Sequence, residues 1–541
     1  MALSNLKKKA KEAYSRILLN KFTATFVVFS FVLCLAQGII QSFLFSVDSE
    51  YKGLLYDIVD TVNSASLLNI TEIPSQFYID NIPLLLCSDV PIGALKRERN
   101  CSVLFDTSRP DPVISQPALV LNKVAFNRED HIVSVINSTG RGRDVGQTCA
   151  QTLLYAHQNL RNFSSEDLTF ILLQFWLLGI SVLAVTNDSV AHLLTTIMTR
   201  ALMTAWSAYS LWRTHNFTVI FRKLYADPGT PCNIDFFSNY FTTRLAYETP
   251  DLVLNVIGFS VISWLSWRLL GMYNAQALRY VGAPEHINRI NKLFLAVLSC
   301  LQLEVFMLLT VMGLWIDVLL NTAIKRISAH TPAYLGVFVS TSVILIPWIT
   351  LGWYSIKREM RRAILVFFFL AFVIILGWSI MFYSLVYRWT FLQWPFLAGC
   401  SVSSFVLIVS STALAIICRL NFGKGLKQYL AAEAALANSG FAPEVFRHDE
   451  EKNAPFDLET ADYKHSSFDP TSPTTKYEQA VPTYIAQPMP HNRSGPTGTS
   501  PTEGRQANAL EAPLEIPGLA ERPARVPVAA LKYNHKTGES F

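Results

Sequence analysis

The chain has 541 residues, of which 51% are hydrophobic and only 16% are charged. Soluble proteins of ordinary composition carry about 25% charged residues, so the totals favour a membrane protein. The net charge of +5 is too small and too dispersed to predict binding to nucleic acid. The sequence contains no phosphate-binding loop, zinc-ligand spacing, nucleophile elbow or HExxH motif. We therefore expect a protein that is not an enzyme and has no cofactor or metal site.

The chain begins with a basic segment, residues 1–22, and then an uncharged apolar run, residues 23–46. This run is long enough to cross a bilayer, and we interpret it as an uncleaved membrane anchor with a cytoplasmic N-terminus. The alternative is a cleaved signal peptide, because residues 34–36 read CLA, a small-x-small pattern. Under both interpretations, the residues that follow enter the lumen or the cell exterior.

Residues 47–167 form the first long polar segment and are expected to be a small α+β domain on the lumenal or extracellular side. Alternating apolar and polar residues at 118–124 and 131–136 predict strands, and residues 148–160 are typical of a helix. A domain in this position could bind a lumenal ligand or protein, whose identity the sequence does not give.

Glycosylation sequons are concentrated on the predicted lumenal side, which indicates a glycoprotein of the secretory pathway. A bridge at Cys101 could compete with modification of its neighbour Asn100, and Asn162 lies close to the next span. The acceptor residues are Asn69, Asn100, Asn137 and Asn162 in this segment and Asn216 in a later loop.

Cysteine usage separates the predicted lumenal segments from the predicted spans. An even number of lumenal cysteines in an oxidising compartment predicts two disulfides, although four cysteines allow three pairings and the sequence does not choose among them. A bridge to Cys232 would tie the loop at 213–251 to the lumenal domain. The four cysteines are Cys87, Cys101, Cys149 and Cys232.

The orientation of the chain is set by the link at residues 354–362, which carries four basic residues between two apolar runs. Such a cluster is held on the cytoplasmic side. The fold class is therefore an all-α polytopic membrane protein with seven or eight transmembrane helices, seven if the first is cleaved. The spans after the first are 168–185, 190–212, 252–271, 293–320, 333–353, 363–387 and 396–418.

The span at 190–212 is the weakest of these, because it contains His192 and a central Arg200. The alternative is an amphipathic helix on the membrane surface. The number of membrane crossings decides against this alternative. For the basic link to be cytoplasmic, the chain must cross the membrane once between residue 187 and residue 251. The loop at 213–251 is then lumenal, although its basic residues go against the positive-inside tendency.

The C-terminal part of the chain is polar and should be cytoplasmic. Residues 419–440 contain good helix formers and predict a juxtamembrane helix on the membrane surface. Residues 441–541 are rich in Pro, Ser, Thr and charge, a composition typical of a disordered tail. Ser472 and Ser500 each precede a proline and are candidate phosphorylation sites, so a cytoplasmic adaptor or kinase is an expected partner.

Two charges fall near the middle of predicted spans, Arg200 and Glu304. An unpaired charge in lipid is expensive, so we expect the two side chains to form a buried ion pair that orients their helices. The alternatives are a protonated Glu304 bonded to another neighbour, or a polar ligand or proton site in the bundle.

The organisation as a whole predicts a receptor, sensor or cargo-type protein of the plasma membrane or an endomembrane, with the lipid bilayer as its first partner. The alternative is a transporter with a polar site near Glu304. A water-accessible polar cavity at Glu304 would favour the transporter, and an open pocket on the lumenal side would favour the receptor.

Overall fold

A computed structural model gives the structure of the protein. Asn69, Asn100, Ser472, Ser500 and the C-terminal tail, for which the sequence makes predictions, lie outside its described residues. The described residues are 11, 14–18, 20–63, 73–76, 84–90, 101–106, 118–127, 131–138, 140–279, 285–322, 324–327, 331–425 and 428.

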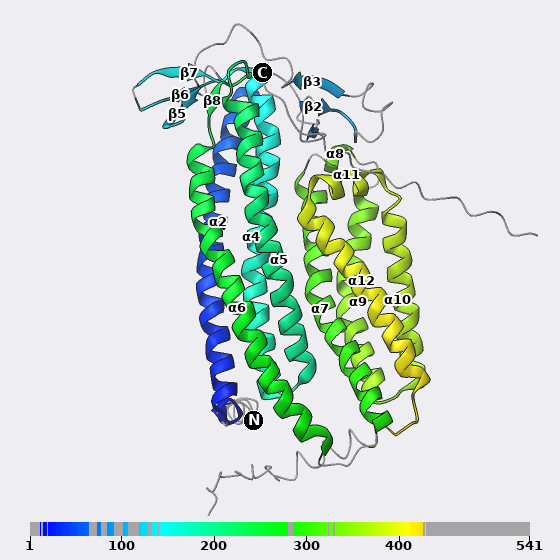
Figure 1. Cartoon of the computed structure of the whole chain (residues 1–541). Helices are drawn as coiled ribbons and strands as arrows, with labels where there is room; N and C mark the ends of the chain where they lie inside the picture. The colour runs from blue at the N-terminus through cyan, green and yellow to red at the C-terminus, as the bar shows by residue number, and fades with distance from the viewer. Residues whose placement is uncertain are drawn as a thin grey trace, which may run out of the picture. The chain divides into compact units, whose positions relative to one another are not determined.

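Long helices account for most of the described chain and pack into two bundles (Figure 1). The first bundle contains α2 (Lys21–Asn63), α4 (Gln147–Thr186), α5 (Val190–Phe221) and α6 (Ser238–Arg279). The second contains α7 (Glu285–Asn321), α9 (Thr331–Lys357), α10 (Arg361–Met381) and α12 (Pro395–Leu420). α5 and α4 also pack against α7 and join the bundles. Short helices connect these elements: η1 (Arg222–Ala226), α8 (Ile324–Ile327) and α11 (Leu385–Gln393).

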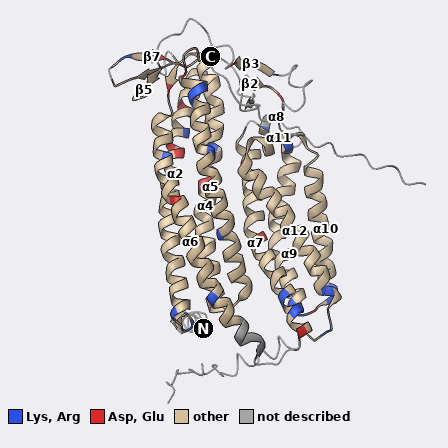
Figure 2. Cartoon of the chain, viewed as in Figure 1, with Lys and Arg blue, Asp and Glu red and all other residues tan. Residues whose placement is uncertain are grey.

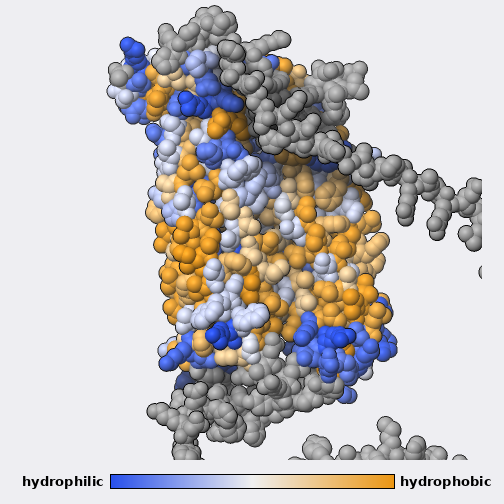
Figure 3. Space-filling view, viewed as in Figure 1, coloured by the Kyte–Doolittle hydropathy of each residue, from blue (hydrophilic) through white to orange (hydrophobic). Residues whose placement is uncertain are grey.

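Among the described residues, seven helices are long and apolar enough to cross a membrane, namely α2, α4, α6, α7, α9, α10 and α12. Figure 3 shows the corresponding apolar band across the visible face, with hydrophilic residues at both ends. The chain is therefore an integral multi-pass membrane protein. α5 carries more polar residues and is not among the seven, but its 32 residues pack along α4, α6 and α7.

The polar segment between α2 and α4 differs in its bounds from the small α+β domain expected at residues 47–167. α2 continues to Asn63 and α4 begins at Gln147, so both ends of the predicted domain are extensions of the long helices. The helix expected at 148–160 is the first part of α4, and the strand expected at 131–136 is β6. The run at 118–124 is divided between two strands.

The chain between these helix extensions forms small sheets, which lie on either side of the helix ends (Figure 1). One antiparallel sheet has the order β1-β2-β3 and another the order β5-β6-β7, while β4 pairs with β8 in parallel. In the second sheet, Lys123 pairs with Ile136 and Ser134 pairs with Asp144. The strands are β1 (Ile73–Gln76), β2 (Leu84–Cys87), β3 (Cys101–Phe105), β4 (Leu119–Val120), β5 (Lys123–Asn127), β6 (Ile132–Ile136), β7 (Gly142–Asp144) and β8 (Ile234–Asp235).

An aromatic core attaches the second sheet to the helices. The ring centroid of Phe221 lies 4.9 Å from that of Phe237 and 5.4 Å from that of Phe241. Val133 and Val135 of β6 belong to the same core and are fully buried. Aromatic pairs at these distances add to the free energy of burial, so the strands are held by packing against helix ends.

Both predicted disulfides are present, and the structure selects their pairing. Cys87 joins Cys101, which links β2 to β3. Cys149 joins Cys232, which links the start of α4 to the segment between η1 and β8. The expected tie between the 213–251 region and the segment before it is therefore confirmed.

Two sequence predictions about element bounds are wrong. Residues 213–251 are mostly helical, because α5 continues to Phe221 and α6 begins at Ser238. Four of their charged side chains, Arg213, Arg244, Glu248 and Asp251, are buried among the helices, whereas Arg222 stays exposed. The helix expected at 363–387 ends at Met381, since the extended backbone at Ser384 interrupts it before α11 begins.

The basic link lies between α9 and α10, where Figure 2 shows basic segments gathered at one end of the second bundle. Above this link, α9 and α10 approach closely because Gly352 has no side chain. A Cβ atom at Gly352 would lie 2.6 Å from the ring of Phe367. That ring stacks on Trp348 at a centroid distance of 5.0 Å, so the glycine permits an aromatic contact between the two helices.

Loss of the Cys149–Cys232 disulfide should destabilise the fold more than loss of the Cys87–Cys101 disulfide. The first closes a separation of 83 residues and the second one of 14 residues. Chain entropy then gives about 4.5 kcal/mol for the long loop and about 3 kcal/mol for the short one. Thermal unfolding of the two double-alanine variants in detergent, followed by tryptophan fluorescence, should rank them in that order. Equal midpoints would contradict the prediction.

Candidate functional site

Charged side chains from four helices meet inside the first bundle, and Figure 2 shows both signs of charge within its upper half. Each is at most 5% exposed. We call this set the charge cluster. Its members are Asp48 of α2, Glu166 and Asp167 of α4, Arg200 and Arg213 of α5, and Arg244, Glu248 and Asp251 of α6.

Arg244 and the carboxyl groups around it form one part of the charge cluster. Its Nη1 donates a hydrogen bond to Asp48, and its Nε donates to Glu248 Oε1 at 2.9 Å. Asp167 Oδ2 lies 3.6 Å from the same Nη1. The hydroxyl of Tyr240 donates to the other oxygen of Asp48 at 2.9 Å. One guanidinium therefore holds carboxylates from α2, α4 and α6.

Arg213 forms the second ion pair of the cluster. Its Nη1 and Nη2 donate to the two oxygens of Glu166 at 2.9 and 2.7 Å, a bidentate geometry that fixes both side chains. Trp394, between α11 and α12, donates its indole N–H to Glu166 Oε1 at 2.8 Å. The guanidinium carbon also lies 4.5 Å from the ring centroid of Phe163. This ion pair thus connects the first bundle to the second.

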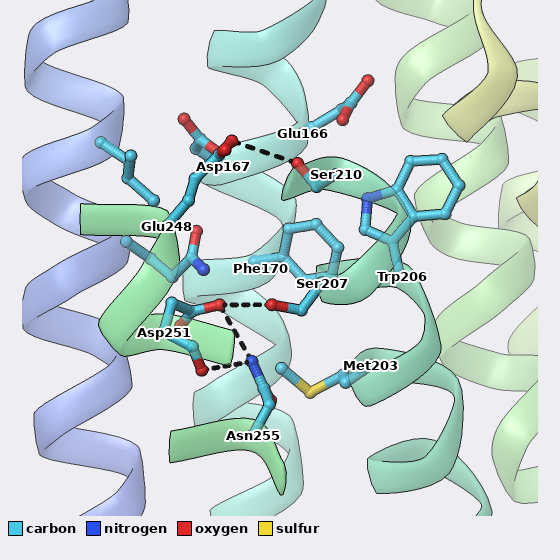
Figure 4. A pocket seen from close by; sticks show the side chains of 12 residues that line it. Glu166, Asp167, Phe170, Met203, Trp206, Ser207, Ser210, Glu248, Asp251 and Asn255 are labelled. Carbon is cyan, nitrogen blue, oxygen red and sulfur yellow. Dashed lines mark hydrogen bonds between the residues drawn. The ribbon is translucent and has the colours of Figure 1, made fainter. Parts of the chain in front are cut away.

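A small cavity of about 20 Å³ lies beside these pairs, and Figure 4 shows its lining. Ser207 donates to Asp251 Oδ2 at 3.2 Å, and Asn255 donates to the same oxygen at 2.9 Å. Ser210 donates to Glu248 Oε1 at 3.2 Å. A cavity of this size with polar walls has room for about one water molecule.

Polar contacts continue from this cavity toward Arg200. Gln37 donates to Asn255 Oδ1 at 2.8 Å, and Arg200 Nη1 donates to Gln37 Oε1 at 2.5 Å. A chain of polar side chains therefore extends inward from Asp251 to Arg200. Among the described residues, no group of three or more His, Cys, Asp and Glu side chains is arranged to hold a metal ion.

A larger cavity lies on the other side of Glu166, between α4, α5 and the junction of α11 with α12. We call it the outer pocket. Its volume is about 250 Å³, and Glu166 lines both this pocket and the small cavity. Its walls carry six aromatic and four amide side chains, Gln393 among the amides, and the Arg213–Glu166 pair forms part of its lining. The lining includes Tyr155, Phe163, Tyr209, Trp212, Phe217, Trp394, Asn159, Asn162 and Asn216.

The structure does not bring Arg200 and Glu304 together, so the predicted ion pair is wrong. Arg200 faces α2 and bonds to Gln37. Glu304 of α7 is fully buried and accepts a hydrogen bond from Ser411 of α12 at 3.2 Å. Their helices, α5 and α7, pack against each other, but the two side chains point to different neighbours. The geometry agrees with the alternative of Glu304 bonded to another residue.

The predicted acceptor asparagines fall in two settings. Asn137 lies in the turn between β6 and β7, where its carbonyl accepts a hydrogen bond from Gly140 at 3.0 Å. Asn162 and Asn216 lie within α4 and α5 and line the outer pocket. Glycosylation at any of these positions remains a prediction.

Sequence reasoning missed most of the charge cluster, because its residues were placed in solvated segments outside the spans. One signal was present in the sequence. Tyr240, Arg244, Glu248 and Asp251 recur at intervals of three and four residues, which places them on one face of a helix. A charged stripe of that kind beside an apolar span indicates a buried network once a neighbouring helix supplies the opposite charges.

Comparisons with known proteins found no protein family, curated protein or solved structure that matches this chain. The helices and the buried charges define the class of protein by themselves. It is an integral multi-pass membrane protein with a polar interior in one of its two bundles.

Glu166 and Arg213 should be energetically coupled. Glu166→Gln or Arg213→Met alone leaves a buried charge without its partner and should cost about 3–5 kcal/mol. The double variant removes both charges and should lose much less than the sum of the single losses. Unfolding free energies measured in detergent test this coupling.

The matched control is the pair Arg200→Met and Glu304→Gln, whose side chains do not meet. Their effects should add to within about 0.5 kcal/mol, as expected for independent sites. Additive losses for Glu166 and Arg213 would show that their bidentate contact does not form in the membrane protein.

Proposed function

We propose that this chain is a multi-pass membrane receptor or sensor that binds a small amphipathic ligand in the outer pocket. The observation that carries the proposal is the pocket itself. It has an aromatic wall, several amide groups and a lining fixed by the Arg213–Glu166 ion pair. Ligand sites are typically concave and mostly apolar, with a few placed polar groups that fix orientation.

The position of the pocket also supports a receptor. Its lining includes the junction of α11 with α12, and α11 lies at the same end of the helices as the strands, whereas the basic link between α9 and α10 lies at the opposite end (Figure 1). Basic links are held in the cytoplasm, so the pocket would face the lumen or cell exterior. The disulfides belong to that side as well, because they form in oxidising compartments.

A route for signalling runs along α12. Trp394 at its start lines the outer pocket and bonds to Glu166. The helix then continues without a break to Leu420, next to the basic link. Just beyond it, the backbone N–H of Gly423 donates to Glu359 Oε2 of that link at 3.2 Å. A shift of Trp394 on ligand binding would be transmitted to the start of the C-terminal tail.

A transporter is the second candidate, and one observation favours it. The polar side chains between the outer pocket and Arg200 extend inward through the first bundle. Buried polar residues of this kind mark substrate or ion pathways in many membrane proteins. The path of a transported substrate would run through the charge cluster, because Glu304 is held in a hydrogen bond with Ser411.

Filling the outer pocket should abolish ligand binding. Asn216→Trp places a large side chain on its wall, whereas Leu202→Trp on the exposed face of the same helix is the matched control. A library of small amphipathic aromatic compounds, screened by thermal unfolding of the full-length protein, should yield ligands. A compound at 100 times its Kd stabilises by about 2.7 kcal/mol.

These compounds should stabilise the wild type and Leu202→Trp, and should lose their effect on Asn216→Trp. Equal stabilisation of all three proteins would place binding elsewhere and contradict the proposal. Flux of a bound compound across proteoliposomes would favour the transporter instead of the receptor.

The orientation is tested separately by protease treatment of sealed vesicles. The tail at residues 419–541 should be removed from the cytoplasmic face, while the strand region and its disulfides remain protected inside. Antibodies against each end of the chain report the fragments. A protected tail would invert the orientation and move the outer pocket to the cytoplasmic side.

A further inference from the structure

The charge cluster contains more acids than its arginines can neutralise. Five carboxyl groups face three guanidinium groups, and all eight side chains are at most 5% exposed. Within the described part of the chain, the other titratable groups that face the cluster are Cys34 on α2, Tyr240 on α6 and Cys400 on α12, and none of these carries a positive charge. Two carboxyl groups are therefore left without a cationic partner.

Particular oxygen atoms identify which carboxyl groups lack a partner. Glu248 Oε2 and Asp251 Oδ1 have no hydrogen-bond partner, and neither has the amide oxygen of Gln41 beside them. These three side chains line the small cavity (Figure 4). Ionised carboxylates with unpaired buried oxygens would cost several kcal/mol each, so a bound proton is the less expensive state.

A second pair of acids shares a single positive charge. Asp48 and Asp167 are both buried beside Arg244 Nη1, and Asp167 Oδ2 has no hydrogen-bond partner. Two like charges in one buried site disfavour ionisation of both groups, so a proton on Asp167 is favoured. The carboxyl pair shares the guanidinium of Arg244, which supplies one positive charge for both acids and for Glu248.

We propose that the charge cluster is a proton-binding site that holds two exchangeable protons near neutral pH. One resides on Asp167 beside Arg244, and the other resides on Glu248 or Asp251 at the small cavity. Glu166 separates this cavity from the outer pocket, so a water molecule in the cavity is well placed to exchange the protons with that side. The site goes beyond the receptor proposal and does not depend on a ligand.

Proton binding has a consequence for stability with a definite sign. The folded protein holds protons on carboxyl groups that are ionised in the unfolded chain at neutral pH. Folding therefore takes up protons, and the free energy of unfolding must fall as the pH rises. Asp167→Asn and Asp251→Asn each replace an acid by a permanently neutral group of the same shape. Each should reduce this pH dependence.

The experiment uses full-length protein in lipid nanodiscs and infrared spectroscopy of the carboxylic-acid C=O stretch, compared in H₂O and D₂O. It is done in a Glu304→Gln background, because Glu304 is also buried and would add a band of its own. A carboxylic-acid band should be present at neutral pH and should lose intensity in Asp167→Asn and in Asp251→Asn. Asp60→Asn, at an exposed position of α2, is the matched control and should leave the band unchanged.

Three results would overturn the proposal. The first is the absence of the band at neutral pH, and the second is a band that neither Asp167→Asn nor Asp251→Asn reduces. The third is a cluster neutralised by a metal cation, which would appear as stabilisation by sodium over choline without a carboxylic-acid band. If a variant fails to fold, thermal unfolding of the background protein between about pH 6 and about pH 8.5 still decides, since stability that does not fall with pH contradicts proton uptake.

Discussion

The arrangement of the first bundle depends on the burial of Arg213 and Arg244. Removing a guanidinium from water costs several kcal/mol, and only close pairing with carboxylates offsets that cost. Arg244 contacts acids on α2, α4 and α6, and Arg213 contacts one on α4. A rotation or slip of any of these helices would leave a charge unpaired in an apolar interior. The ion pairs therefore fix the rotation and depth of α2, α4, α5 and α6 relative to one another.

The outer pocket is a consequence of the same constraint. Glu166 accepts both N–H groups of Arg213 and the indole N–H of Trp394, so its carboxylate cannot turn away from the pocket wall. Phe163 packs under both guanidinium groups, with ring centroids 4.5 Å from Arg213 and 4.8 Å from Arg244. A site built from groups already held in place loses little conformational entropy when a ligand binds.

The second bundle is organised by different physics. Its core is mainly apolar, with Glu304 as a buried acid bonded to Ser411, and aromatic stacking replaces ion pairing. The ring of Trp315 stacks between Phe338 and Tyr387 at centroid distances of 5.6 and 4.7 Å. Such packing tolerates small adjustments better than a bidentate ion pair, because dispersion contacts are individually weak. A rigid polar bundle joined to a more adaptable apolar one through Trp394 is a suitable arrangement for transmitting a change along α12.

The sequence by itself determined the membrane class, the approximate positions of the apolar helices and the presence of two disulfides, because these follow from local hydropathy and cysteine count. It also placed Arg200 and Glu304 in buried positions. Only the tertiary structure decided which charges meet. Arg244 finds Asp48 from a distance of 196 residues along the chain, and no local pattern reports such a partner. Half of the charges that suggested a solvated loop at residues 213–251, namely Arg213, Arg244, Glu248 and Asp251, are buried, since the cost of burying a charge depends on partners that only the folded bundle supplies.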